Sequence, residues 1–357
     1  MSETIEGRVT HIRSTICEVD AGDRSYECTA RGRLVERDSG QSKPLVVGDR
    51  VLFRPTDEGE GVVVEILPRR TKLSRRLPRD ARIEHIIAAN VDQLLIVASI
   101  RRPPLTLGII DRYIIAGEAG GLLPIICINK TDLAGDSTEH LEAAELYREM
   151  GYAVLLTSAK TGEGVDALRD VLRDRSTVLA GHSGVGKSAL INAVQPGMEL
   201  RTGPVTTKGR HTTSSVSLLR LEFGGYVVDT PGIREFTLWE IEEGEVQQFF
   251  PRIWELSHDC KLPDCTHMHE PDCAVKAALE RGELPESRYD SYTRIVETLE
   301  SPEVPRDTDV EQPREQIARR KRRPSRRARK QELWRRAEEA MEGEEPEDED
   351  EEDYRPR

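Results

Sequence analysis

Up to about Pro68, apolar and polar positions alternate in five short runs, and glycine or aspartate separates one run from the next. A period of two is typical of strands that bury one face, and glycine and aspartate suit the turns between them. Five such strands predict a small β-barrel, for which an OB-fold is the natural candidate; a generic small β domain is the alternative. The five runs are GRVTHI, STICEVD, RSYECTAR, DRVLFRP and GVVVEILP.

From about Ile83 onward the pattern changes, because apolar runs alternate with segments of helical spacing. This alternation predicts an α/β domain with a mostly parallel, doubly wound sheet, in which ligands bind beyond the carboxyl ends of the strands. The predicted strands are VDQLLIVASI, LLPIICI, YAVLLTSA and STVLAG; the predicted helices are residues 109–119, residues 139–150 and GVDALRDVL.

The motif with the clearest chemistry is GHSGVGKS, which matches G-x-x-x-x-G-K-[ST] between the strand STVLA and the helix SALINAV. Its glycines let backbone N–H groups surround a β-phosphate. Lys187 would reach the β- and γ-oxygens, and Ser188 would coordinate Mg²⁺. The phosphate-binding prediction covers Gly181, His182, Ser183, Gly184, Val185, Gly186, Lys187, Ser188 and Ala189.

Two segments after the phosphate loop are candidates for the switches that respond to the bound nucleotide. DTPG follows the strand YVV, and we expect Asp229 to act near the magnesium and the Gly232 N–H to sense the γ-phosphate; a simple Pro-Gly turn is the alternative. The segment VTTKGRHTTSS offers Thr212 as the second protein ligand of Mg²⁺, with Thr213 as the rival; a solvated loop is the alternative.

The residue after Gly232 is Ile233, whose side chain cannot orient a water molecule as the glutamine at this position does in many GTPases. His211 is therefore the candidate catalytic group, beside Lys187 and Thr212, because an imidazole can both donate and accept. A histidine that merely solvates a loop is the alternative.

A guanine-reading motif, NKTD, lies before the phosphate loop. Asp132 would accept from the guanine N1–H and amine, which adenine lacks, and Asn129, Lys130 and Thr131 would complete the base contacts. Ser158, Ala159 and Lys160, at the end of the next strand, match the loop that backs the base. Ordinary GTPases have the phosphate loop first and the base reader later, so one cyclic cut relates the two orders. The sequence thus describes a circularly permuted GTPase.

Three of the six cysteines cluster late in the chain with a histidine, as Cys260-x4-Cys265-x-His267-x5-Cys273. Three thiolates and one imidazole suit one tetrahedral Zn²⁺. His258 and His269 are rival imidazoles that four-coordination does not require, and three free cysteines in a loop are the alternative. Helical segments over residues 274–281 and 287–299 would pack beside the metal.

Composition limits the partners. The 357 residues are 37% apolar and 33% charged, with a formal net charge of −13, which excludes uniform attraction to nucleic acid and leaves local basic patches. No stretch approaches the ~20 apolar residues of a membrane span, and a cytoplasmic protein is expected. From about Ser301, a basic and then an acidic tract predict a disordered tail or a bare helix; the basic tract could bind RNA or fold on its acidic neighbour.

In this order, the barrel, NKTD, TSAK, GHSGVGKS, KGRHTT, DTPGIREF and the cysteine cluster resemble the RsgA (YjeQ) family of ribosome-dependent, circularly permuted GTPases over about residues 7–299. The charged tail departs from the expected pattern. The resemblance implies a GTP hydrolase that binds GTP or GDP, Mg²⁺ and one Zn²⁺. It also implies that this enzyme assists late maturation of the small (30S) ribosomal subunit, binds rRNA, and is stimulated and released by that subunit.

The expected fold is an α/β, circularly permuted P-loop GTPase domain with an N-terminal OB-fold β-barrel and a small C-terminal zinc-binding helical domain. Expected limits are 1–70 for the barrel, 71–240 for the GTPase, 241–300 for the zinc domain and 301–357 for the tail. We expect a monomer. Two other functions stay open at this point: a GTP-dependent metal-handling protein, and an RNA-binding scaffold with a degenerate nucleotide site.

Overall fold

A computed structural model of the chain gives the fold. The residues that it describes are 4–13, 15–22, 24–30, 45–56, 59–77, 80–198, 216–229, 238–239 and 241–300.

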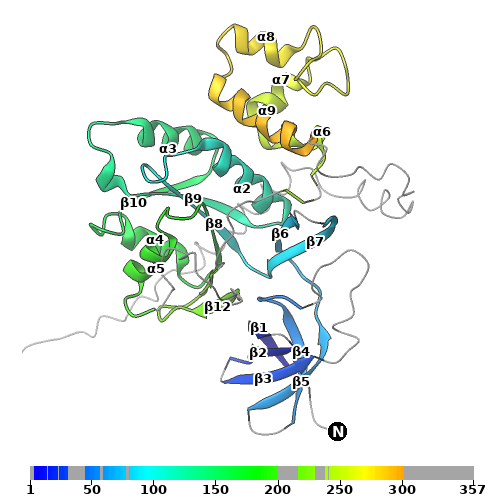
Figure 1. Cartoon of the computed structure of the whole chain (residues 1–357), viewed down its shortest axis with the longest axis vertical. Helices are drawn as coiled ribbons and strands as arrows, with labels where there is room; N and C mark the ends of the chain where they lie inside the picture. Colours follow the sequence, from blue (N-terminus) through cyan, green and yellow to red (C-terminus); the bar gives the residue numbers. More distant parts are fainter. Residues whose placement is uncertain are drawn as a thin grey trace, which may run out of the picture. The chain divides into compact units, whose positions relative to one another are not determined.

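The N-terminal strands form a closed barrel (Figure 1). Strand β1 pairs with both β2 and β4, while β5 pairs with β3 and β4, so every strand has two neighbours. The alternation seen in the sequence places Val9, Val19 and Phe53 in its core, each with no exposed surface. This confirms the predicted five-stranded, OB-like barrel. Its strands are β1 (Ile5–Arg13), β2 (Ile16–Asp20), β3 (Ser25–Ala30), β4 (Arg50–Pro55) and β5 (Glu60–Ile66).

A six-stranded α/β sheet follows in the order β10-β9-β8-β11-β13-β12. Its strands are parallel except β12, which runs antiparallel to β13. Strand β11, which leads into the phosphate loop, lies in the interior of the sheet between β8 and β13 although it comes late in the chain. The strands are β8 (Gln93–Ser99), β9 (Leu123–Asn129), β10 (Ala153–Thr157), β11 (Ser176–Ala180), β12 (Ser217–Arg220) and β13 (Tyr226–Asp229).

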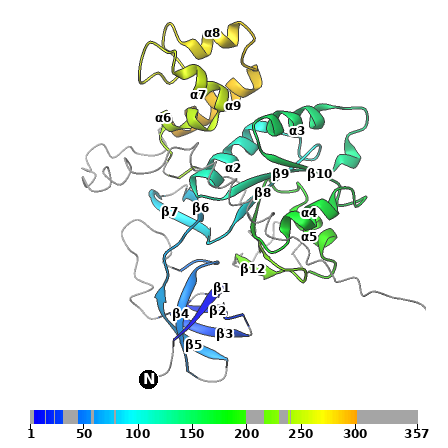
Figure 2. The ribbon, with the colours of Figure 1, turned by 180° about the vertical axis from the view of Figure 1, so that it is seen from behind.

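Helices cover both faces of this sheet (Figures 1 and 2). Successive residues of β8 point to opposite faces, so Leu94 and Ile96 pack in one core with α2 and α3, whereas Leu95 and Val97 pack in the other with α4 and α5. The continuous apolar runs of the sequence are explained by this burial on two sides. The helices are α2 (Leu107–Ala119), η1 (Thr131–Leu133), α3 (Glu139–Glu149), α4 (Val165–Leu172) and α5 (Lys187–Val194).

The barrel is joined to the edge of the sheet. Strand β1 pairs with β12 at His11 and Ser217, whose Nδ1 and Oγ are hydrogen-bonded at 2.9 Å. Arg8 reaches from the barrel to donate to Ser176 Oγ at 2.8 Å and to the Asn90 carbonyl. The strand that follows the predicted switch I segment is therefore held by the barrel.

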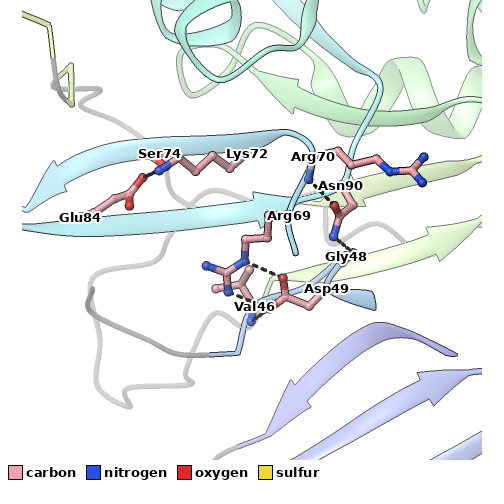
Figure 3. A network of polar contacts seen from close by, with 9 residues as sticks. All are labelled: Val46, Gly48, Asp49, Arg69, Arg70, Lys72, Ser74, Glu84 and Asn90. Atoms are coloured by element: carbon pink, nitrogen blue, oxygen red, sulfur yellow. Dashed lines mark hydrogen bonds and ion pairs between the residues drawn. The ribbon is translucent and has the colours of Figure 1, made fainter. Parts of the chain in front are cut away.

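A second junction lies where the chain leaves the barrel (Figure 3). Arg69 forms a two-point ion pair with the fully buried Asp49, whose Oδ2 also accepts from the Val46 N–H at 2.8 Å. Asn90 accepts from the Arg70 N–H and donates to the Gly48 carbonyl. Beyond it, β6 (Lys72–Leu77) and β7 (Asp80–Ala89) pair as a hairpin that the sequence analysis missed, because its many arginines obscure the strand alternation.

The remaining described helices form a small C-terminal group. Among them α9 packs against α2 of the sheet's helical layer, and the two share an apolar core that includes Ile110 and Tyr292. These helices are α6 (Glu243–Val246), η2 (Gln247–Phe249), α7 (Pro251–Ser257), α8 (Ala274–Glu280) and α9 (Glu286–Glu300). Among the described residues, none of the helices is both long and apolar enough to cross a membrane.

Candidate nucleotide and metal sites

The phosphate loop connects β11 to α5, as the motif requires. Gly181, Gly184 and Gly186 all have positive φ, and a Cβ on Gly181 would lie 2.1 Å from the Val97 carbonyl oxygen. The loop can thus lie against β8 only because Gly181 lacks a side chain. Lys187 folds back over the loop, and its Nζ donates to the carbonyls of Gly181 at 2.7 Å and His182 at 3.2 Å.

The predicted base-reading loop lies next to the phosphate loop. Asn129 ends β9 and is 1% exposed, and its Nδ2 donates to the Val185 carbonyl at 2.9 Å. Lys130, in the left-handed conformation, donates from Nζ to the Gly184 carbonyl at 2.6 Å and to the carbonyls of Arg101 and Arg102. Side chains of NKTD therefore connect this loop to the phosphate loop, which lies 54 to 56 residues further along the chain.

The TSAK segment contacts the base-reading loop. Ser158 Oγ donates to Asp132 Oδ1 at 2.7 Å, and Lys160 Nζ lies 3.7 Å from Asp132 Oδ2. Ala159 N donates to Asn129 Oδ1 at 3.3 Å. The carboxylate that is predicted to read guanine is thus oriented by the loop that is predicted to back the base.

Some contacts at this site were not predicted from the sequence. Thr131 Oγ1 donates to Glu163 Oε2 at 2.6 Å, and the Ser158 N–H donates to the Glu163 carbonyl at 2.9 Å, so Glu163 braces both loops. The carbonyls of Arg101 and Arg102, which hold Lys130, belong to backbone whose position depends on the tertiary fold. A single sequence has no residue pattern that shows which backbone carbonyls will accept such hydrogen bonds.

The described residues include only part of the predicted switches. Asp229 ends β13, but its side chain, and all of Gly232, Ile233, His211, Thr212 and Thr213, lie outside the described residues, as does the charged tail. Their roles stay predictions. Ser188 lies in the first turn of α5.

The four predicted metal ligands come together in the C-terminal group. The ligand atoms of Cys260, Cys265, His267 and Cys273 all lie within 4.8 Å of one another. His267 Nδ1 is 3.6 Å from Cys260 Sγ and 3.4 Å from Cys273 Sγ, and the two sulfurs are 3.9 Å apart. A tetrahedral Zn²⁺ with ordinary bond lengths separates its ligand atoms by about 3.5–3.8 Å. The cluster therefore fits a metal ion such as zinc.

The surroundings of the cluster suit neutral imidazole and bound thiolates. His267 Nε2 lies 2.7 Å from Gln247 Oε1, which accepts a hydrogen bond from the Nε2–H and leaves Nδ1 as the ligand atom. Burial lowers the pKa of His267, which favours the neutral ring. Burial also raises the pKa of Cys265 to about 12, so its deprotonation calls for a nearby cation. Gln247 was not foreseen, because it lies 20 residues from His267.

Several hydrogen bonds fix the loop that contains His267. Burial opposes ionisation of Glu270, but hydrogen bonds from Thr266 Oγ1 and from the backbone N–H groups of Thr266 and His269 lower the pKa of this carboxyl to about 2. Tyr289 and Tyr292 donate to the carbonyls of His267 and Thr266 at 2.7 and 2.8 Å. Helix α9 thus holds the metal-binding loop in place.

Comparison with known proteins identifies the family. The RsgA GTPase family model matches residues 66–239, and the RsgA N-terminal domain model matches residues 6–63. A relative from Gemmatimonas aurantiaca, the small ribosomal subunit biogenesis GTPase RsgA, is 42% identical over 308 residues, which are 84% of this chain and 99% of the relative. The chain belongs to the RsgA family of GTPases. The predicted resemblance and enzyme class are thereby confirmed.

Other RsgA relatives agree. The small ribosomal subunit biogenesis GTPase RsgA 2 of Bacteroides thetaiotaomicron is 39% identical over 279 residues, or 77% of this chain and 90% of the relative. YjeQ from Thermotoga maritima has a crystal structure that matches with a TM-score of 0.68 and 34% identity, over 84% of this chain and 99% of that one. YloQ, described as a circularly permuted GTPase, matches with a TM-score of 0.61 and 35% identity, over 84% and 96%. The permuted fold is confirmed.

Proposed function

We propose that this RsgA-family GTPase hydrolyses GTP to GDP and phosphate while it assists late maturation of the small (30S) ribosomal subunit, and that hydrolysis stimulated by the subunit releases it. The main support for the proposal is a set of hydrogen bonds. Through Asn129, Lys130 and Ser158, they bring NKTD, TSAK and the phosphate loop into contact with one another. The names of the relatives support the ribosomal role.

In the proposed site, Asp132 reads the guanine edge, Asn129 and Lys130 shape the base pocket, and the backbone of residues 181–189 binds the phosphates. Lys187 leaves its carbonyl partners for the β- and γ-oxygens. Ser188 and Thr212 hold Mg²⁺, which supplies charge neutralisation at the phosphates. Asp229 and Gly232 sense the γ-phosphate, and His211 orients water.

The proposed zinc ion is structural, with Cys260, Cys265, His267 and Cys273 as its complete ligand set. A closed four-ligand set opposes the metal-handling alternative, because transfer needs an open position. We also propose the domain limits 1–70, 71–240, 241–300 and 301–357, direct rRNA contact by basic patches, a monomeric state and a cytoplasmic location.

One experiment separates the candidate functions. Phosphate release from GTP and from ATP is measured with Mg²⁺, with and without purified small subunits. We expect slow release from GTP alone, strong stimulation by the subunit, and little release from ATP. A metal-handling protein would hydrolyse GTP without response to the subunit, and a binding scaffold would bind the subunit without hydrolysis. Equal affinity for ATP and GTP would contradict the guanine site.

A further inference from the structure

Strands β1, β12 and β13 lie side by side where the barrel joins the α/β sheet (Figure 1). One row of residues crosses all three strands, since His11 of β1 is opposite Ser217 of β12, and Ser217 is opposite Asp229, the last residue of β13. Asp229 is also the residue that is proposed to act near the Mg²⁺ of the nucleotide site. A barrel residue thus lies only two strands away from the strand end that leads into DTPG.

A β-bulge turns His11 toward this row. Val9 is opposite Val19, and both are buried in the core of the barrel. Residues two apart on a regular strand share a face, so His11 would also point inward. The register shifts between Val9 and His11, however, and His11 is opposite the exposed Glu18 instead. Opposite residues of an antiparallel pair share a face, so the bulge directs His11 out of the barrel, where its Nδ1 lies 2.9 Å from Ser217 Oγ.

The barrel also holds the other end of β13. Tyr226, the first residue of β13, donates its hydroxyl to Asp20 Oδ2 of β2 at 3.0 Å, and the Arg8 guanidinium lies 5.1 Å from its ring centroid. Arg8 in turn donates to Ser176 Oγ at the start of β11, the strand that leads to the phosphate loop. Strand β13 is therefore tied to the barrel directly at its first residue, and through β12 at its last. These ties oppose any shift of β13 relative to the barrel.

We propose that His11 and Ser217 are positioning residues for the Mg²⁺ side of the nucleotide site, through which the barrel fixes the backbone of Asp229. The barrel thereby contributes to Mg²⁺-dependent nucleotide affinity, although none of its residues belongs to the predicted nucleotide motifs. A partner that binds the barrel also gains a route to the site, because a shift of β1 displaces β12 and β13 with it. The inference rests on the proposed nucleotide site and deepens it.

The first test is Ser217→Val, with Ser217→Thr as the matched control. Both new side chains are β-branched and suit a strand, but only threonine keeps the hydroxyl that pairs with His11. Affinity for a fluorescent GDP analogue is measured with Mg²⁺ and again with EDTA. With Mg²⁺ we expect about a fivefold loss in Ser217→Val only, the size of one hydrogen bond, and with EDTA we expect no loss. Equal affinities in the two variants, or an equal loss with and without Mg²⁺, would overturn the positioning role.

The second test asks whether the two residues act as one unit. His11→Phe keeps an aromatic ring but removes the nitrogen that pairs with Ser217. Its control is Thr10→Val on the same strand, which removes a hydrogen bond to the Glu18 carbonyl within the barrel. We expect His11→Phe to lose as much Mg²⁺-dependent affinity as Ser217→Val, the double variant to lose no more than either, and Thr10→Val to lose none. Losses that add in the double variant would refute the pairing.

Failure of the proposed nucleotide site would give a different result. An unchanged protein that does not bind the GDP analogue would reject the site itself, whereas equal binding by the unchanged protein and all variants would reject only the positioning role. Circular dichroism checks that each variant is folded. If His11→Phe does not fold, the comparison of Ser217→Val with Ser217→Thr decides the matter alone, because it leaves the barrel unaltered.

Discussion

The side-chain amide of Asn129 donates a 2.9 Å hydrogen bond to the carbonyl oxygen of Val185, which lies 56 residues further along the chain. The same amide accepts at Oδ1 from Ala159 N and Thr157 Oγ1. One buried side chain therefore joins the base-reading loop, the backing loop and the phosphate loop. Because these contacts are spatial, a cyclic change of chain order leaves them intact.

Gly186→Ala is expected to disrupt this junction. At its φ of +102°, a Cβ would lie 2.4 Å from Asn129 Nδ2. Strain of about 1–3 kcal/mol, borne by the phosphate loop, should weaken GDP binding about 5- to 150-fold. The measurement is GDP affinity by calorimetry.

Gly197→Ala is the control for that variant, since Gly197 also has a positive φ, +91°, but has nothing within 4 Å of the added carbon. It should lose stability from backbone strain alone and keep its GDP affinity. An equal loss of affinity in both variants would show that strain, and not the clash with Asn129, is responsible.

Asp132→Asn should change the preferred base. The substitution removes the charged acceptor for the guanine N1–H and amine, and should cost about 2–4 kcal/mol of GTP binding. Xanthosine nucleotides carry a carbonyl in place of the amine, so their affinity should rise. Competition between GTP and xanthosine triphosphate measures this, with Asp136→Asn in the same loop as the control. Unaltered preference in Asp132→Asn would mean that another residue reads the base.

Much of this fold follows from local patterns, and the rest does not. The strand β11, the phosphate loop and the helix α5 each carry their own signal, in a buried run, glycines and helical spacing. The buried ion pair between Asp111 of α2 and Arg288 of α9 carries none, because its partners are 177 residues apart and neither charge is unusual in sequence. Gln247 is similar, since a glutamine acquires its role only when the fold sets it beside His267.

Gln247→Leu should weaken the metal site without removing a ligand. Its amide oxygen fixes the His267 tautomer, and loss of such a partner lowers metal affinity about 10- to 100-fold. Competition with a chromophoric chelator measures zinc affinity, and metal analysis of the unchanged protein should find about one Zn²⁺ per chain. The neighbouring Gln248→Leu serves as the control. If both variants hold zinc as firmly as the unchanged protein, Gln247 has no role in orienting the ligand.

Binding to the small subunit should fall steeply with salt, despite the net charge of −13. If local Lys and Arg groups neutralise rRNA phosphates, the logarithm of affinity should decrease linearly with the logarithm of salt concentration. Truncation after residue 300 tests the tail separately, because it keeps α9 whole. Unchanged affinity in the truncated protein would show that the basic tract is not a principal contact, whereas a reduced salt slope would place phosphate contacts in the tail.

Stimulated hydrolysis is predicted to depend on His211. Ile233 occupies the position where many GTPases have the water-orienting glutamine, so another group must perform that role, and the basal rate should be slow. His211 lies in the GRHTT segment, among the residues predicted to form switch I. We predict that contact with the ribosomal subunit brings the His211 imidazole to the γ-phosphate, which would account for stimulation by the subunit.

The variant His211→Ala tests this role, once binding of GTP and of the subunit is shown to be intact. Subunit-stimulated hydrolysis should then collapse, whereas slow basal hydrolysis should change little, because on this hypothesis His211 acts only in the complex with the subunit. His258→Ala is the control, since His258 is an exposed histidine at the end of α7, away from the nucleotide site, and its ring lies 2.7 Å from the Trp254 carbonyl. Undiminished stimulation in His211→Ala would refute the role and assign the water-orienting group to rRNA or a ribosomal protein.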